Sequence, residues 1–134
     1  MSTLKIDKTD SSVGVILNSE THELSFIGES RPENVRAFFL PIIDWITAYG
    51  RELTDKLATE NQIDCNATFQ LEYFNSSSAK CIVDILLALQ KIRSISPKIK
   101  LSINWKYEQD DDDLLEAGQE FVRLTGIDMN FIEV

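Results

Sequence analysis

The stretch "ATFQLEYFNSSSAKCIVDILLALQKIRSIS", residues 67–96, decides the fold of this 134-residue chain. Its first part, Ala67–Asn75, carries aromatic and apolar residues on both parities, which predicts a strand near the centre of a sheet. Its second part, from Ser77 to Ser96, carries apolar residues at helical spacing and predicts a long helix. Three serines, Ser76–Ser78, mark the turn at which the strand ends and the helix begins.

The segments on either side of this stretch continue the alternation of strands and helices. In chain order we expect a short edge strand in residues 4–10, a hairpin of Val13–Asn18 with Glu23–Gly28, a long helix within residues 30–60, the strand and helix above, a strand in residues 98–108, a helix in residues 110–126 and a last strand in residues 127–134. Strands that alternate with helices pair in parallel through right-handed crossovers. The prediction is an α/β fold, a single sheet with helices packed on it, in one domain spanning residues 1–134.

The composition excludes several classes of function. The net charge of −9 argues against unaided binding to nucleic acid or to an anionic membrane, because both require clustered Lys and Arg. No apolar run approaches the roughly 18 residues of a membrane span. The opening "MSTLKIDKTD" lacks the apolar core of a secretory signal. We therefore expect a cytoplasmic protein without direct membrane insertion.

The residues that carry catalysis or bind metals are sparse. Cys65 and Cys81 stand apart and His22 is the one histidine, so we expect no zinc site. Cys81 lies in the apolar helical run and is expected to be buried. A serine nucleophile needs a base within hydrogen-bond reach, and the chain has neither a GxSxG elbow nor a glycine-rich phosphate loop. We expect no metal, no cofactor and no enzymatic activity.

The serine turn has two interpretations that the residues alone leave open. In the structural one, a serine hydroxyl caps the helix by accepting a hydrogen bond from a first-turn amide. In the functional one, Ser76 is phosphorylated, because the amides and the dipole at a helix N-terminus favour an anion. A phosphate there would bring about −1.5 to −2 charges, and Lys80, about one turn into the helix, is placed to pair with it.

Two further polar stretches lie at predicted helix starts. The acidic run Asp110–Asp113 complements the dipole of the helix that it opens. A divalent-ion site or an acidic contact with a basic partner is the alternative. Pro32, Glu33 and Asn34 are expected to begin the long helix, with Pro32 in its first turn.

Three segments together, "SRPENVRAFFLPIIDWI", "LEYFNSSSAKCIVDILLAL" and "NWKYEQDDDDLLEAGQEF", resemble the SiaC family of bacterial regulatory phosphoproteins over almost the whole chain. The Pro-Glu-Asn of residues 32–34 and the Asn-Ser-Ser-Ser turn followed by Lys80 are the most specific parts. The family is similar in architecture to the STAS domains of anti-sigma-factor antagonists, which also carry a phosphorylated Ser or Thr at a strand-to-helix turn. The resemblance implies a STAS-like architecture and a non-catalytic switch.

The resemblance also implies partners and site residues. In the family, a serine/threonine protein kinase phosphorylates the hydroxyl after the Asn, and a PP2C-type phosphatase removes the phosphate. The unphosphorylated form activates a diguanylate cyclase, which raises cyclic di-GMP and favours biofilm. Carried over, the acceptor is Ser76, with Ser77 and Ser78 as alternatives because many members have Thr where this chain has Ser. The candidates for contact with the phosphate or the partner are Asn75, Lys80, Glu33 and Asn34.

The runner-up function comes from a different class. An α/β domain with free amides at a helix start is also suited to bind a small ligand or anion, or to act as an enzyme with the serine turn as its site. Acceptance of one phosphate at the turn from a kinase separates the two hypotheses.

Overall fold

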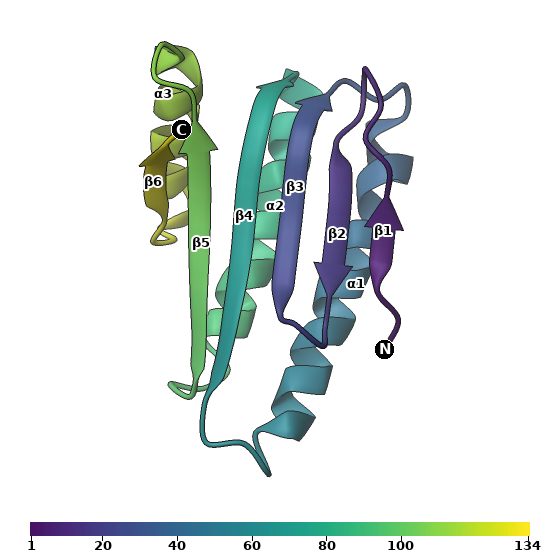
Figure 1. Ribbon diagram of the computed structural model, residues 1–134, viewed down its shortest axis with the longest axis vertical. Coiled ribbons are helices and arrows are strands. Elements are labelled where there is room, and N and C mark those ends of the chain that lie inside the picture. The colour runs from purple at the N-terminus through teal and green to yellow at the C-terminus, as the bar shows by residue number, and fades with distance from the viewer.

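The computed structural model describes all 134 residues, and its elements follow the predicted order. These elements are β1 (Leu4–Ile6), β2 (Gly14–Asn18), β3 (Glu23–Ser30), α1 (Val35–Lys56), β4 (Ile63–Phe74), α2 (Ser76–Arg93), β5 (Ile99–Tyr107), α3 (Asp112–Thr125) and β6 (Asn130–Glu133) (Figure 1). The predicted α/β fold with a single sheet is confirmed. None of the helices combines the length and the hydropathy that a bilayer crossing needs.

The six strands lie in the sheet in the same order as in the chain. Strands β1, β2 and β3 pair antiparallel, whereas β3, β4, β5 and β6 pair in parallel. Because each parallel pair is joined by a right-handed crossover that advances in the same direction, all three helices fall on one face of the sheet. Figure 1 shows the three helices behind the strands, which leaves the other face open.

Strand β4 lies inside the sheet, as the sequence predicted. It pairs with β3 on one side and with β5 on the other. Every second residue from Ile63 to Leu71 is buried, whereas the residues between them are partly or fully exposed. This alternation follows because the helices cover only one face of the sheet.

A row of aromatic side chains lies between the sheet and its helices. Phe26 of β3 stacks on Phe69 of β4 with ring centroids 4.7 Å apart, and Phe69 lies 5.9 Å from Trp105 of β5. Trp105 meets Phe121 of α3 edge to face, and Phe74 at the end of β4 contacts both rings. Such pairs add about 0.5–1.5 kcal/mol each beyond the area they bury. This row ties the parallel strands to α3.

Gly118 lets α3 approach Trp105 closely. A Cβ at residue 118 would lie 2.7 Å from the Trp105 ring and 2.8 Å from the Phe131 ring. The indole is fixed, because Trp105 is 1% exposed and its Nε1 donates a hydrogen bond of 3.0 Å to the Leu114 carbonyl. Only glycine fits at this position without movement of the core.

Replacing Gly118 with Ala should lower the free energy of unfolding by about 1–2 kcal/mol, because overpacking outweighs the gain in helix propensity. Urea unfolding measures the change. Gly50→Ala in α1 is the matched control, since the nearest atoms to a Cβ there are side-chain atoms of Ile92 at 3.3 Å and of Ile95 at 3.8 Å. A Gly118→Ala protein as stable as the wild type would contradict this account of the close packing.

Candidate functional site at the serine turn

The predicted site residues lie at one end of the sheet. Strands β3 and β4 run parallel, and each is followed by a helix. Helices α1 and α2 therefore begin at the same end of the sheet, where these strands finish. This arrangement places residues 32–34 next to the serine turn. Val35, at the start of α1, and Ser77, near the start of α2, line the same surface cleft.

A β-bulge sets the direction in which the serine turn leaves the sheet. Gly28 of β3 pairs with Leu71, but the next residue of β3 pairs with Tyr73, so β4 carries one extra residue between them. Gly28 has a φ of 114°, which a side chain would make costly. After the bulge, Phe74 packs among the core aromatics while Tyr73 is 48% exposed.

Asn75, and not a serine, caps α2. Its Oδ1 accepts a hydrogen bond of 2.8 Å from the Ser78 amide, and its carbonyl accepts one of 3.0 Å from the Ala79 amide. Asn75 therefore lies outside β4, in which the sequence had placed it. The structural interpretation of the serines as caps was wrong, because a side chain one residue earlier already performs this role.

Ser78 anchors the turn to β3. It is 0% exposed, its Oγ donates a hydrogen bond of 3.1 Å to the Ser30 carbonyl, and it accepts one of 2.8 Å from Ser30 Oγ. The Asn75 amide donates to the same carbonyl at 3.2 Å. Sequence reasoning missed Ser30, although it shares the inward parity of Leu24 and Phe26 in β3. A kinase cannot reach Ser78 in this conformation, which counts against it as the acceptor.

Ser76 and Ser77 occupy the first two positions of α2 and are both exposed. Neither hydroxyl makes a hydrogen bond within the protein. The first amides of a helix have no intrahelical partner. An anion attached at this point would therefore meet unpaired donors and the positive end of the helix dipole.

A cleft of about 510 Å³ opens beside these serines, between the starts of α1 and α2. Two of the residues that line it are cations, Lys80 of α2 and Arg36 of α1, and neither forms an ion pair. Sequence reasoning identified Lys80 but missed Arg36, because only the adjacent helix starts bring Arg36 to the turn. Cys81 also lines this cleft and is partly exposed, which corrects the expectation that it is buried. Burial and the nearby Asp84 still raise the pKa of its thiol above the ordinary value.

The Pro-Glu-Asn segment starts α1 in a different way from the one predicted. The helix begins at Val35, so Pro32 and Glu33 precede it. Asn34 is the cap, and its Oδ1 accepts a hydrogen bond of 3.0 Å from the Ala37 amide. Glu33 is exposed beside this cap and makes no ion pair. The two helices that meet at the site thus carry the same kind of asparagine cap.

The acidic run lies at the start of α3, as the sequence predicted. Asp111 caps the helix, with its Oδ1 accepting a hydrogen bond of 3.0 Å from the Leu114 amide. Asp112 and Asp113 are exposed in the first turn, where they complement the helix dipole. No three His, Cys, Asp or Glu side chains of the protein converge as metal ligands.

A second polar cluster lies at the opposite end of β3 from Ser30. His22 Nδ1 is 2.5 Å from the Tyr49 hydroxyl, which is 3.3 Å from Cys65 Sγ. Burial raises the pKa of Tyr49 and of Cys65. The one imidazole of the chain is therefore held in a different part of the fold from the serine turn and is not placed to act as its base.

Comparison with known proteins identifies the class. Residues 6–134 match the family described as "SiaC family regulatory phosphoprotein". The chain is 27% identical to apo-SiaC from Pseudomonas aeruginosa, with a TM-score of 0.78 and coverage of 98% of this chain and 99% of the other. It also resembles a chain in the crystal structure of the diguanylate cyclase SiaD in complex with its activator SiaC, again from Pseudomonas aeruginosa, at 24% identity, a TM-score of 0.81, and coverage of 98% and 99%.

A further relative is an uncharacterized protein of Pseudomonas aeruginosa strain UCBPP-PA14. The two are 28% identical over 121 residues, which cover 90% of this chain and 88% of the relative. The fold and the matches together define a small α/β regulatory protein. The chain belongs to the SiaC family of regulatory phosphoproteins.

Replacing Asn75 with Ala should destabilise the protein by about 0.5–2 kcal/mol, the usual effect of removing a helix cap. Ser77→Ala is the matched control and should change stability by no more than about 0.5 kcal/mol, because its exposed hydroxyl has no partner. Thermal or urea unfolding gives both values. Equal effects of the two substitutions would mean that the serines share the capping role.

Stability should fall in acid in part because of His22. Burial and the nearby Lys56 lower the pKa of His22 below its ordinary 6.5, against the opposing effect of Glu60 and Glu52. The unfolded chain therefore binds a proton at a higher pH than the folded one. The stability that neutral His22 contributes is complete above about pH 6.5 and is lost as the pH falls below it.

The His22→Asn protein tests this dependence. Asn does not titrate and tolerates the φ of 61° at residue 22. Between about pH 7.5 and about pH 5.5, the urea midpoint of the wild type should fall further than that of His22→Asn. Equal shifts in the two proteins would assign the acid sensitivity to other groups.

Proposed function

We propose that this protein is a phosphorylation-controlled activator of a diguanylate cyclase, with Ser76 as the phosphate acceptor. The observation that carries the proposal is the division of roles at the turn. Asn75 and Ser78 hold the fold, whereas the Ser76 hydroxyl is exposed and unpaired at the start of α2. A phosphate can therefore be added to Ser76 and removed from it without breaking a contact that the fold needs.

A serine/threonine protein kinase adds this phosphate and a PP2C-type phosphatase removes it. Both enzymes need a hydroxyl that projects from the surface, and the strand-to-helix turn presents Ser76 in that way. The kinase takes its phosphate from ATP, so the exchange belongs in the cytoplasm. Ser77 is the alternative acceptor, because it is exposed at the next position.

The phosphate changes the charge of the partner surface more than it changes the fold. It adds about −1.5 to −2 charges beside Lys80 and Arg36, the unpaired cations of the adjacent cleft. Asn34 and Glu33 directly precede Val35, which lines the cleft, so a partner that covers the turn would also contact them. A partner that engages these cations in the unphosphorylated state would lose them to the phosphate.

The identity of the partner is supported by the relative whose structure is known. SiaC of Pseudomonas aeruginosa is an activator of the diguanylate cyclase SiaD, and the two folds match over nearly their whole length. We assign the present chain the same kind of target, and with it a role in cyclic di-GMP signalling and biofilm formation. The protein itself contributes no catalytic step, since Ser76 has no imidazole near it.

The test is the affinity of the protein for its cyclase, measured by calorimetry. The unphosphorylated wild type and Ser76→Ala should bind equally well. The enzymatically phosphorylated protein should bind at least about tenfold more weakly, a change of about 1.4 kcal/mol. Ser76→Asp should weaken binding in the same direction to the extent that a carboxylate mimics phosphate.

Ser77→Ala is the matched control and should still accept phosphate and lose affinity on phosphorylation. Peptide mapping of the phosphorylated protein identifies the acceptor. Phosphate on Ser77 would move the switch by one residue. Equal affinities for the phosphorylated and unphosphorylated forms would rule out the switch, and phosphate-independent capture of a small anion at the turn would favour the runner-up function.

A further inference from the structure

The serine turn presents two exposed hydroxyls in succession, and nothing in their own chemistry distinguishes one from the other. Ser76 and Ser77 occupy the first two positions of α2, and neither hydroxyl makes a hydrogen bond within the protein. A kinase that recognised only an exposed serine would modify both. If Ser76 is the single acceptor, a feature of the turn sets the two serines apart.

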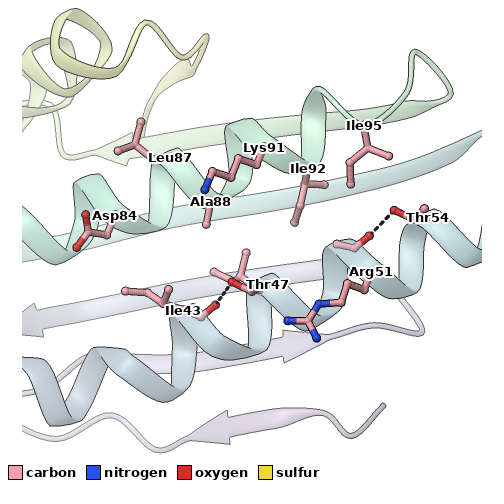
Figure 2. Close-up of a pocket in the computed structure, with 12 residues that line it drawn as sticks. Ile43, Thr47, Arg51, Thr54, Asp84, Leu87, Ala88, Lys91, Ile92 and Ile95 are labelled. Atoms are coloured by element: carbon pink, nitrogen blue, oxygen red, sulfur yellow. Dashed lines mark hydrogen bonds between the residues drawn. The ribbon is translucent and has the colours of Figure 1, made fainter.

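The helical phase of α2 gives the two serines different directions. Successive residues of an α-helix are rotated by about 100° around its axis, from about 3.6 residues per turn. Ser77 therefore shares a face with Asp84, seven residues later, and Figure 2 shows Asp84 on the side of α2 that faces α1. Ser77 and Asp84 both line the cleft between these helices, whereas Ser76 does not. Ser76 lies about 160° around the axis from the buried Ser78 and projects away from the core.

The sequence permits more than one start for α2. Asparagine and serine are about equally good N-caps, so Asn75, Ser76 and Ser77 compete for this position. With Ser76 as the cap, its hydroxyl would accept a hydrogen bond from the amide of Ser78 or Ala79. The Ser76 hydroxyl would then be engaged, and Ser77 would become the first helical residue with a free hydroxyl.

The carbonyl of Ser30 selects the start at Asn75. It accepts a hydrogen bond of 3.2 Å from the Asn75 amide and one of 3.1 Å from the Ser78 hydroxyl. These two donors lie at the two ends of the first turn, so both reach one acceptor when this turn is formed from Asn75 onward. The Asn75 side chain closes the same turn, because its Oδ1 accepts a hydrogen bond of 2.8 Å from the Ser78 amide. Ser30 and Ser78 are both buried, so water does not replace these contacts.

We propose that Ser78 is the positioning residue that makes Ser76 the phosphate acceptor. Its buried hydroxyl ties the first turn of α2 to the Ser30 carbonyl, which keeps the helix start at Asn75 and leaves the Ser76 hydroxyl free. The inference rests on the proposed function, because it explains how a kinase modifies one exposed serine and not its neighbour. Ser78 thus acts in the modification through Ser76, without accepting phosphate itself.

Mapping of the phosphorylated residues by mass spectrometry, after reaction with the kinase, tests the selection. The wild type should carry its phosphate on Ser76. Ser78→Ala removes the donor to the Ser30 carbonyl, so Ser76 should become the cap in part of the molecules. The ratio of phosphate on Ser76 to phosphate on Ser77 should then fall at least about tenfold, because the loss of one buried hydrogen bond changes an equilibrium by about that factor.

Ser30→Ala is the matched control for a general loss of stability. Both substitutions remove the hydrogen bond of 2.8 Å that the Ser30 hydroxyl donates to Ser78 Oγ. Ser30→Ala keeps the backbone carbonyl, however, and with it both hydrogen bonds that hold the first turn. This variant should therefore still carry its phosphate on Ser76. Equal loss of selectivity in the two variants would show that general loosening redistributes the phosphate, and would overturn the proposal.

Amide hydrogen exchange, measured by NMR, locates the start of α2 without any kinase. In the wild type the Ser78 amide should be protected by the Asn75 side chain, whereas the Ser77 amide has no acceptor and should exchange rapidly. In Ser78→Ala the protection of the amide at residue 78 should fall at least about tenfold, and in Ser30→Ala it should stay as in the wild type. Wild-type amides of Ser77 and Ser78 that exchange equally fast would overturn the proposed start of the helix.

The outcomes separate this inference from the proposed function. Phosphate on Ser76 in the wild type and in both variants, at an unchanged ratio, would retain the switch and remove the role of Ser78. Phosphate on Ser76 and Ser77 alike in the wild type would overturn the selection. A wild type that accepts no phosphate would remove the switch itself, and with it the acceptor that Ser78 is proposed to select.

Discussion

The carbonyl of Ser30 is the point on which the arrangement of the site depends. It accepts a hydrogen bond from the Asn75 amide and another from the Ser78 hydroxyl, so the end of β3 holds the start of α2. Because α1 leaves the sheet only a few residues after Ser30, the same contact fixes the two helix starts relative to each other. This relative placement of the two helix starts forms the cleft and brings its two cations next to the exposed serines. A buried carbonyl with two donors is also costly to leave unpaired, which makes the contact strongly specified.

The serine turn separates the side chains that hold the fold from the hydroxyl that is proposed as the phosphate acceptor. A hydroxyl that caps a helix or fills a buried site cannot also accept a phosphate without loss of stability. Here the duties fall on different residues, with Asn75 as the cap, Ser78 as the buried anchor and Ser76 as the free hydroxyl. The third serine of the run is thus a structural residue with the same chemistry as its neighbours, which explains why three stand together.

Hydrophobic periodicity was sufficient to predict the order of all nine elements, because each strand and helix has an inward face that its own spacing reveals. It did not predict which faces of the sheet are covered. Apolar Tyr73 and Phe74 follow Leu71 in sequence and suggest burial on both parities, but a bulge reverses the parity at this point. The pairing of Ser30 with Ser78 spans 48 residues, and the approach of Arg36 to Lys80 joins two helices. Contacts of this kind leave no local signal in the sequence.

The range of electrostatic forces limits how a phosphate on Ser76 can act. At physiological ionic strength charges at the surface are screened beyond about 8 Å. Residues 76 and 91 are about 22 Å apart along α2, from the helical rise per residue. A phosphate at the first position of the helix therefore acts on Lys80 and Arg36, which line the adjacent cleft, and leaves Lys91 in the last turn of α2 unaffected. A partner that bound only near the last turn of α2 would not detect the modification. For Ser76 to control binding, the partner must therefore cover the start of α2.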